Sequence, residues 1–340
     1  MLVSHSDLAA AVSNAGEGGI GSIGGLTMTP KVLSKEISWL KKGLVDKTLP
    51  FGVDLAIPQI GGSARKTNHD YTHGHLPELI DIIVQEKAKL FICAVGVPPK
   101  WAVEKLHAGG VVIANMAPPA RKLVGSVRNT EKALDAGVDV IIAQGSETQS
   151  EGGGHTGDIG TMCLIPQVAD ACRGHVNAFG SPVLCVAAGG IFDGRGLAAA
   201  LALGAAGVWV GTRFICAEES AAPKSHKDKV IASSSADTVR TLAVSGRPLR
   251  LIPNDWIKSW EREPQKVKEL CDQGIVPLEH DLKKASEDRR LRSAIFDAIN
   301  SLAGQAGAGS PGPKRGQLVF LPLFSHAFFC MFVCILYIYI

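Results

Sequence analysis

Short apolar runs alternate with amphipathic stretches along most of the chain. The runs are rich in Val, Ile, Leu and Ala and are continuously apolar, which is typical of strands buried on both faces. The stretches between them have helical spacing, and several end at glycine, as helix C-termini commonly do. Because a helix follows each strand, the pattern predicts a parallel sheet covered by helices. The predicted strands span 19–25, 51–57, 90–96, 111–117, 139–145, 183–190 and 207–212.

The first predicted element is a helix, Asp7 to Asn14, with Ser6 as its N-cap. A closed (β/α)₈ barrel needs eight strands, and the strand that would precede this helix is missing or reduced to "MLV". Seven strands also fit an open, doubly wound sheet. We favour an α/β fold of the (β/α)₈ TIM-barrel type with its first strand missing or truncated, because glycine-rich segments follow the last three strands in order, as in phosphate-binding barrels.

The C-terminal end of the chain differs from the rest. Residues 318–340 contain no Lys, Arg, Asp or Glu and are long enough to cross a bilayer as a helix. We therefore expect a barrel domain over 1–300, a flexible Gly/Ala/Pro-rich linker over 301–317 and a hydrophobic tail over 318–340. The tail is interpreted either as a membrane anchor or as an aberrant C-terminus from a faulty gene model. Its uniform hydrophobicity argues against a core helix or an amphipathic surface helix.

Composition narrows the function classes. The chain is 46% hydrophobic and 6% aromatic, with 38 glycines, which is typical of an α/β enzyme. The net charge of +3 is small and its basic residues are scattered, so nucleic acid is not an expected partner. The eight cysteines include no CxxC pair and no zinc-like Cys/His spacing. We interpret them as reduced thiols of a cytoplasmic protein that binds no metal, and the N-terminus has no secretory signal pattern.

Two late strand ends have phosphate-binding character. Gly189 and Gly190 follow one strand, and Gly211 and Thr212 follow the next. Backbone N–H groups at such turns bind anions, and glycine lets a phosphate approach closely. Each turn alone is equally consistent with an ordinary tight turn, but two on adjacent strands predict a phosphate site. GxGxxG and GxxxxGK[ST] patterns are both absent from the sequence, which argues against a dinucleotide fold and a P-loop ATPase.

Two further candidate site residues lie at the end of the strand predicted over 139–145 and in the loop after it. Gln144 ends that strand and has both a donor and an acceptor for the edge of a heterocyclic ring, although a capping amide would look the same. His155 lies in "EGGGHTGD", a loop too rich in glycine to bury it in a core. An imidazole titrates near neutrality and can take a proton from a substrate. His69, His73 and His75 cluster in what we interpret as a solvated loop.

Together these segments resemble the nitronate monooxygenases. The resemblance is carried by "DLAAAVSNAG", "AQG" followed by "GGHTGD", "AAGGIFDGRGLAAALALGA" and "GVWVGTRF", and it runs from about residue 3 to about residue 290. It implies a TIM barrel that binds FMN without a covalent link or a metal and oxidises alkyl nitronates with O₂ to a carbonyl compound and nitrite. It implies that His155 is the active-site base. It also implies that Gly189, Gly190, Gly211 and Thr212 hold the FMN phosphate, with Gln144 and Gly145 beside the flavin.

Some features depart from this pattern. The family begins with a strand that touches the flavin, "SETQSE" after Gly145 is longer than expected, and the tail is not a family feature. Two alternatives therefore stay open. One is an FMN-dependent enoyl reductase, whose barrel and "GGH" motif are similar and which would use a nicotinamide reductant. The other is an inactive, membrane-tethered remnant. The sequence specifies neither the physiological nitro compound nor the oligomeric state.

Overall fold

The computed structural model describes residues 3–16, 18–62, 64–117, 128–148, 159–285 and 288–303. His155 and the tail at 318–340 lie outside these described residues, as does most of the expected linker. In the described part of the chain, no helix is both long and apolar enough to cross a membrane.

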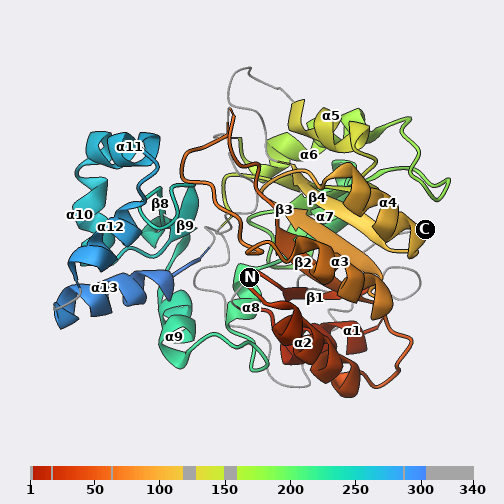
Figure 1. The fold of residues 1–340 in the computed structure, drawn as a ribbon, viewed down its shortest axis with the longest axis horizontal. Coiled ribbons are helices and arrows are strands. Elements are labelled where there is room, and N and C mark those ends of the chain that lie inside the picture. Colours follow the sequence, from red (N-terminus) through yellow and green to blue (C-terminus); the bar gives the residue numbers. More distant parts are fainter. Residues whose placement is uncertain are drawn as a thin grey trace.

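The core of the molecule is a curled parallel sheet (Figure 1). Its seven strands are arranged in chain order, each paired in parallel with the next. All seven predicted strands are confirmed within a few residues at their ends. The strands are β1 (Gly21–Gly24), β2 (Phe51–Ala56), β3 (Leu90–Ala94), β4 (Val112–Ala117), β5 (Val140–Gln144), β6 (Leu184–Ala188) and β7 (Gly207–Trp209).

Helices cover the outer face of this sheet and give it a TIM-barrel-like architecture (Figure 1). Outward-facing strand residues such as Val53, Phe91 and Ile141 pack against helix residues such as Leu33 and Ile80 in one hydrophobic cluster. The helices are α1 (Ser6–Asn14), α2 (Pro30–Gly43), α3 (Leu76–Gln85), α4 (Lys100–Ala108), α5 (Arg128–Asp135), α6 (Thr161–Cys172) and α7 (Gly194–Ala202).

The start of α1 corrects one expectation. Ser6 is the first helical residue, and the N-cap position belongs to His5, whose side chain makes no capping bond. The Ser6 N–H instead donates to Glu36 Oε2 on α2 at 3.0 Å. A carboxylate from a neighbouring helix thus satisfies this end of α1, which is why no capping side chain is needed there.

Alternate strand residues point into the barrel, and their character changes around it. On β3 to β6 most inward positions are apolar, as with Ile92, Met116 and Val186, and they form a second cluster. Gln144, at the end of β5, is a polar exception that lines a pocket. On β1 and β2 the inward positions are small or polar. Ser22 pairs in register with Gly52, and Gly24 pairs with Asp54. The interior therefore becomes polar beside the edge of the sheet at β1.

The two end strands of the sheet, β1 and β7, do not pair with each other among the described residues. The N-terminal segment lies along this seam. The Ser4 carbonyl accepts a hydrogen bond from Gly24 N at 2.9 Å, and the Ser4 hydroxyl donates to the Ser22 carbonyl. On the other side, the Val3 carbonyl accepts from Ala221 N at 3.3 Å. Val3 and Ser4 thus connect β1 to the chain that follows β7.

A smaller helical unit beside the barrel has its own core (Figure 1, teal and blue). Trp256, Trp260 and Ile295 are buried in it against the antiparallel pair β8 and β9. The elements after β7 are α8 (Thr212–Ile215), α9 (Lys224–Ala232), the 3₁₀ turn η1 (Ser235–Asp237), β8 (Val239–Thr241), β9 (Leu249–Leu251), α10 (Asp255–Glu261), α11 (Pro264–Asp272), α12 (Pro277–Lys284) and α13 (Arg289–Ile299).

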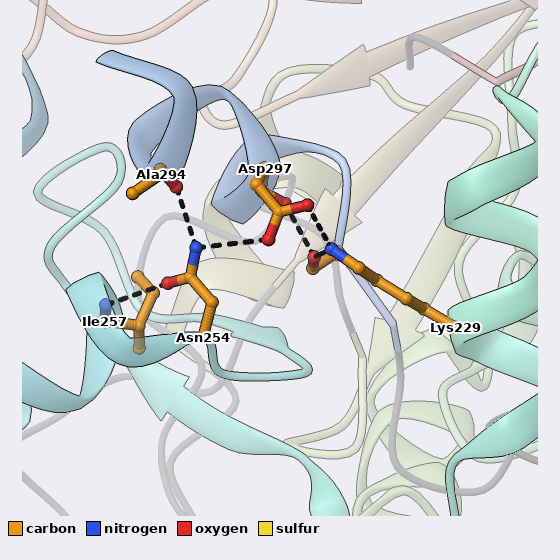
Figure 2. A network of polar contacts seen from close by, with 6 residues as sticks. Lys229, Asn254, Ile257, Ala294 and Asp297 are labelled. Atoms are coloured by element: carbon orange, nitrogen blue, oxygen red, sulfur yellow. Dashed lines mark hydrogen bonds and ion pairs between the residues drawn. The ribbon is translucent and has the colours of Figure 1, made fainter. Parts of the chain in front are cut away.

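Polar contacts hold α13 against α9 and α10 (Figure 2). Lys229 of α9 forms an ion pair with Asp297 of α13. Asn254, the N-cap of α10, accepts from Ile257 N at 3.0 Å and donates to the Ala294 carbonyl at 2.7 Å and to Asp297 Oδ2 at 3.3 Å. One side chain therefore caps one helix and ties it to another.

Candidate functional site

A pocket opens at the carboxyl ends of the strands, where barrel enzymes carry their active sites. It encloses about 960 Å³ of empty space, a figure that includes its open mouth. The inward ends of β1, β2, β4, β5, β6 and β7 contribute to its lining, together with the N-terminal segment and α8. The curled sheet thus brings residues far apart in sequence to one cavity.

Three buried polar atoms in the lining have no hydrogen-bond partner in the described part of the chain. They are Ser22 Oγ on β1, Asp54 Oδ1 on β2 and Gln144 Oε1 on β5. The three residues are between 2% and 6% exposed. An unpaired buried polar atom costs about 1 to 3 kcal/mol, and native proteins leave few of them. Their meeting in one cavity indicates that the pocket binds a polar ligand.

The turn after β6 adopts the left-handed backbone conformation that a pair of glycines predicts. Gly189 has φ of +113° and Gly190 has φ of +68°, both in the region that favours glycine. Both residues line the pocket. Side chains here would be strained whatever the ligand, so this turn alone does not separate an anion cradle from a tight turn.

Gly211, which follows β7, separates these two interpretations better than Gly189 and Gly190 do. Its φ is −118°, which any residue can adopt, and a Cβ built there would meet no atom of the described chain within 4 Å. Neither backbone strain nor protein packing therefore requires glycine at this position. Close approach of a bound group to the backbone would explain a glycine here. Gly211 and Thr212 line the same pocket as Gly189, so the residues fit a phosphate-bearing cofactor.

Gly145 has a different setting from the other predicted residues. A Cβ at Gly145 would lie 2.2 Å from Thr161 Oγ1 and 2.4 Å from Thr161 N, so glycine here lets the start of α6 pack against β5. Its N–H donates to the Ala188 carbonyl at 3.0 Å. Gly145 is not among the residues that line the pocket. Its role beside the flavin stays a prediction.

Glu147 lies in the pocket lining after β5. Its carboxylate accepts from Thr161 N at 3.0 Å and from Thr161 Oγ1 at 2.8 Å, which satisfies the first turn of α6. The next residue, Thr148, would come within 2.8 Å of a Cβ at Gly189. The first residues of the long "SETQSE" segment therefore lie directly against the glycine turn.

Asp54 is the functional candidate that the sequence analysis missed. Its carboxyl group lies inside the barrel, and burial raises its pKa from 3.8 to about 7. A signal was present, since Asp54 is the single charged residue in the apolar run "FGVDLAI". A charge in a predicted inner strand of a barrel has to face either the helices or the cavity, and the register with Gly24 directs it to the cavity.

The structure thus brings Gln144, Gly189, Gly190, Gly211 and Thr212 together around one cavity. His155 lies outside the described residues, so its position relative to them stays a prediction. Among the described residues there is no group of three His, Cys, Asp or Glu that could hold a metal ion.

Comparison with known proteins identifies relatives of this chain. The sequence model of the nitronate monooxygenase family matches residues 1–313. A Bacillus subtilis protein named "Probable nitronate monooxygenase" is 31% identical, with 88% of this chain and 85% of that protein covered. A Rhodococcus jostii relative named as a 5-hydroxy-7a-methyl-1-oxo-octahydro-1H-indene-4-carboxyl-CoA dehydrogenase is 37% identical, over 92% of this chain and 81% of that protein.

A solved structure supports the same architecture. The nitroalkane oxidase from Streptomyces ansochromogenes superposes with a TM-score of 0.71 at 24% identity, covering 92% of this chain and 88% of that one. At this identity the likeness shows the TIM-barrel fold alone. The family match, by contrast, covers nearly the whole chain. The protein is therefore a member of the nitronate monooxygenase family of flavin oxidoreductases.

Proposed function

We propose that the protein binds FMN and oxidises alkyl nitronates with O₂ to a carbonyl compound and nitrite. The observation that carries this proposal is the meeting of three unpaired buried polar atoms, on Ser22, Asp54 and Gln144, in a cavity bordered by two glycine turns. Family membership supports the reaction class, and the turns support a cofactor with a phosphate group.

The residues divide into two groups by chemistry. The backbone at Gly189, Gly190, Gly211 and Thr212 would hold the FMN phosphate. Gln144 Oε1, which lacks a donor, would accept a hydrogen bond from an N–H at the edge of the flavin ring. Bound FMN would supply the redox chemistry, accepting electrons from the substrate and passing them to O₂.

His155 is proposed as the base that takes the α-proton from a neutral nitroalkane. A nitronate has already lost that proton, so its oxidation does not need the base. Replacing His155 with Asn should therefore reduce turnover of nitroalkanes far more than turnover of nitronates, without loss of flavin. Equal loss for both substrates would contradict the base role, and loss of flavin would assign His155 to cofactor binding.

The direct test of the whole proposal is spectroscopic. The purified protein should carry a flavin that is released on denaturation and identified as FMN by mass. A nitronate added without oxygen should bleach its visible spectrum, and in air it should consume O₂ and yield nitrite. A colourless protein that cannot be reconstituted with FMN would be the inactive remnant considered above.

The same assay separates two other reactions. Bleaching by NADH but not by nitronate would favour the enoyl reductase. Bleaching by an acyl-CoA alone would favour a dehydrogenase, the second candidate suggested by the Rhodococcus jostii relative. Neither result would be expected from a nitronate monooxygenase.

Gly211 gives a sharp test of the phosphate site. Because no atom of the described chain lies within 4 Å of a Cβ there, Gly211→Val should fold normally. It should weaken FMN binding, by about tenfold or more if the added methyl groups displace the phosphate. Riboflavin, which lacks the phosphate, is the matched control ligand, and its affinity should change little. Equal FMN affinity in the variant and the parent would remove this turn from the phosphate site.

A further inference from the structure

The charge of the pocket does not match the charge of its proposed substrate. Its described lining contains two acidic residues, Asp54 and Glu147, and no Lys, Arg or His. A nitronate is an anion whose charge resides on its two oxygen atoms. In a cavity of low dielectric constant, an ionised Asp54 would repel that charge strongly. The described lining therefore favours anion binding only if neutral donors provide it.

The surroundings of Asp54 keep its carboxyl group neutral over part of the physiological pH range. On one side, β1 contributes Ser22 and Gly24, which carry no charge. On the other side, β3 contributes Ile92 in register and Cys93 next to it. Burial and the neighbouring Asp54 charge raise the pKa of the Cys93 thiol, so it stays uncharged as well. The other titratable group in the described lining is Glu147, whose negative charge cannot stabilise a second carboxylate. The positive charge of the chain's amino terminus lowers the pKa of Asp54, but burial outweighs that effect.

The geometry of Asp54 matches this chemistry. Its Oδ1 atom is buried, has no partner among the described residues, and lines the same cavity as Gln144. An unpaired carboxylate oxygen in this position would be costly, whereas a protonated carboxyl has an O–H to donate. Burial raises the pKa of Asp54 to about 7, so both forms are accessible near neutral pH.

On the basis of the proposed function, we propose that Asp54 works in its protonated form, as a hydrogen-bond donor to an oxygen atom of the bound nitronate. The proton stays on Asp54, and no bond is made or broken at this residue. The O–H compensates the negative charge on the substrate oxygens in a pocket whose described lining has no cationic side chain, as donors aimed at an oxyanion do. The role is distinct from that of His155, which acts on the α-carbon proton.

The proposal predicts a specific pH profile. As pH rises above about 7, Asp54 ionises and repels the substrate, so kcat/KM for a nitronate should fall, by up to tenfold per pH unit. Asp54→Asn keeps the shape and an N–H donor but cannot ionise. This variant should stay active and should lose the alkaline fall. Asp54→Leu has no donor and should be lower in kcat/KM by about tenfold or more at pH 6.

Asp139 offers a matched control. It is a second buried acid, just before β5 at the opposite end of the barrel, where its Oδ2 accepts from Ile113 N at 2.7 Å and contacts His107 Nε2 at 3.0 Å. Asp139→Asn should leave the pH dependence of kcat/KM unchanged. An alkaline fall that persists in Asp54→Asn, or one that disappears in Asp139→Asn, would overturn the proposal.

A second measurement does not depend on turnover. Infrared difference spectra of the wild-type protein between about pH 6 and about pH 9 should contain the band of a protonated carboxyl group that is absent from Asp54→Asn and present in Asp139→Asn. Absence of that band at pH 6 would overturn the protonated state of Asp54. A normal band in a protein that does not oxidise nitronates would instead reject the proposed function, and with it the nitronate as the ligand of Asp54.

Discussion

Glu147 places a negative charge next to the turn that is proposed to hold a phosphate. Its Oε2 atom would lie 3.6 Å from a Cβ at Gly189, and its carboxylate is already committed to Thr161 at the start of α6. A phosphate bound at the same turn therefore has to tolerate a nearby carboxylate. Glu147 thus stabilises the start of α6 and, if the proposed phosphate site is correct, would also oppose binding of the phosphate.

We therefore expect Glu147→Gln to bind FMN more tightly than the wild-type protein. Glutamine keeps an acceptor for Thr161 but removes the charge, and the repulsion that is lost should be about 1 kcal/mol, or roughly fivefold in Kd, at low salt. Fluorescence titration of the flavin-free protein measures this directly. The difference between the two proteins should shrink in high salt, because the ions screen a half-buried carboxylate. Weaker binding in the variant would mean that the carboxylate supports the site.

Asp54 also links stability to pH. Its pKa is about 7 in the folded protein and about 3.8 when the chain is unfolded. Between these values the folded state keeps a proton that the unfolded state releases, so the free energy of unfolding falls as pH rises from about 4 to about 7 and then levels off. Each unit of pKa difference corresponds to about 1.4 kcal/mol, which sets an upper limit of a few kcal/mol for this residue.

Asp54→Asn should remove this dependence. Thermal unfolding followed between about pH 5 and pH 8 should reveal a variant whose advantage in Tm over the wild-type protein grows as the pH rises. A constant difference in Tm across that range would mean that the Asp54 carboxyl group titrates alike in the folded and unfolded chains.

At the level of elements, the sequence predicted the strands of the parallel sheet, because their hydrophobic pattern is distinctive. Continuous apolar runs located all seven strands, because strands buried on both faces leave little room for polar residues. Ser6 was wrongly chosen as a cap because its actual partner, Glu36, comes from another helix. A hydrogen bond between two different helices depends on the folded structure and cannot be predicted from the residues next to the helix start.

The contact between α10 and α13 can be tested at Asn254. Asn254→Ala removes the cap of α10 and the donor to the Ala294 carbonyl, and it should lower the free energy of unfolding of the helical unit by about 1 to 2 kcal/mol. Asn254→Ser is the matched control, because serine still caps α10 but is too short to reach α13. Chemical denaturation should rank the wild type above Ser and Ser above Ala. Equal stability of the Ser and Ala variants would mean that the cap contributes little.

At the scale of the whole molecule, the seam between β1 and β7 is the feature that the sequence predicted least well. The count of seven strands was correct for the parallel sheet, although β8 and β9 were not predicted. Hydrophobic pattern alone could not say what lies along the free edge of β1. In the structure, Val3 and Ser4 lie there and also line the pocket. The polar interior of the site follows from the same arrangement, because Ser22 and Asp54 belong to the strands nearest this seam. Only the curled sheet reveals that these two residues line the same pocket as Gln144.

The seam therefore couples the closure of the fold to the binding site, and the N-terminal segment should matter to both. In a chain where a single Met replaces residues 1–5, Gly24 N loses the Ser4 carbonyl and the pocket loses part of its wall. We expect faster hydrogen exchange at the Gly24 amide, because its hydrogen bond is gone, and FMN binding weaker by about tenfold. Full-length Ser4→Ala is the control, since it keeps the backbone carbonyl and loses only the side-chain bond to Ser22, and it should change both quantities little. Unchanged protection of Gly24 together with unchanged FMN affinity in the shortened chain would mean that the barrel holds its shape and its site without this segment.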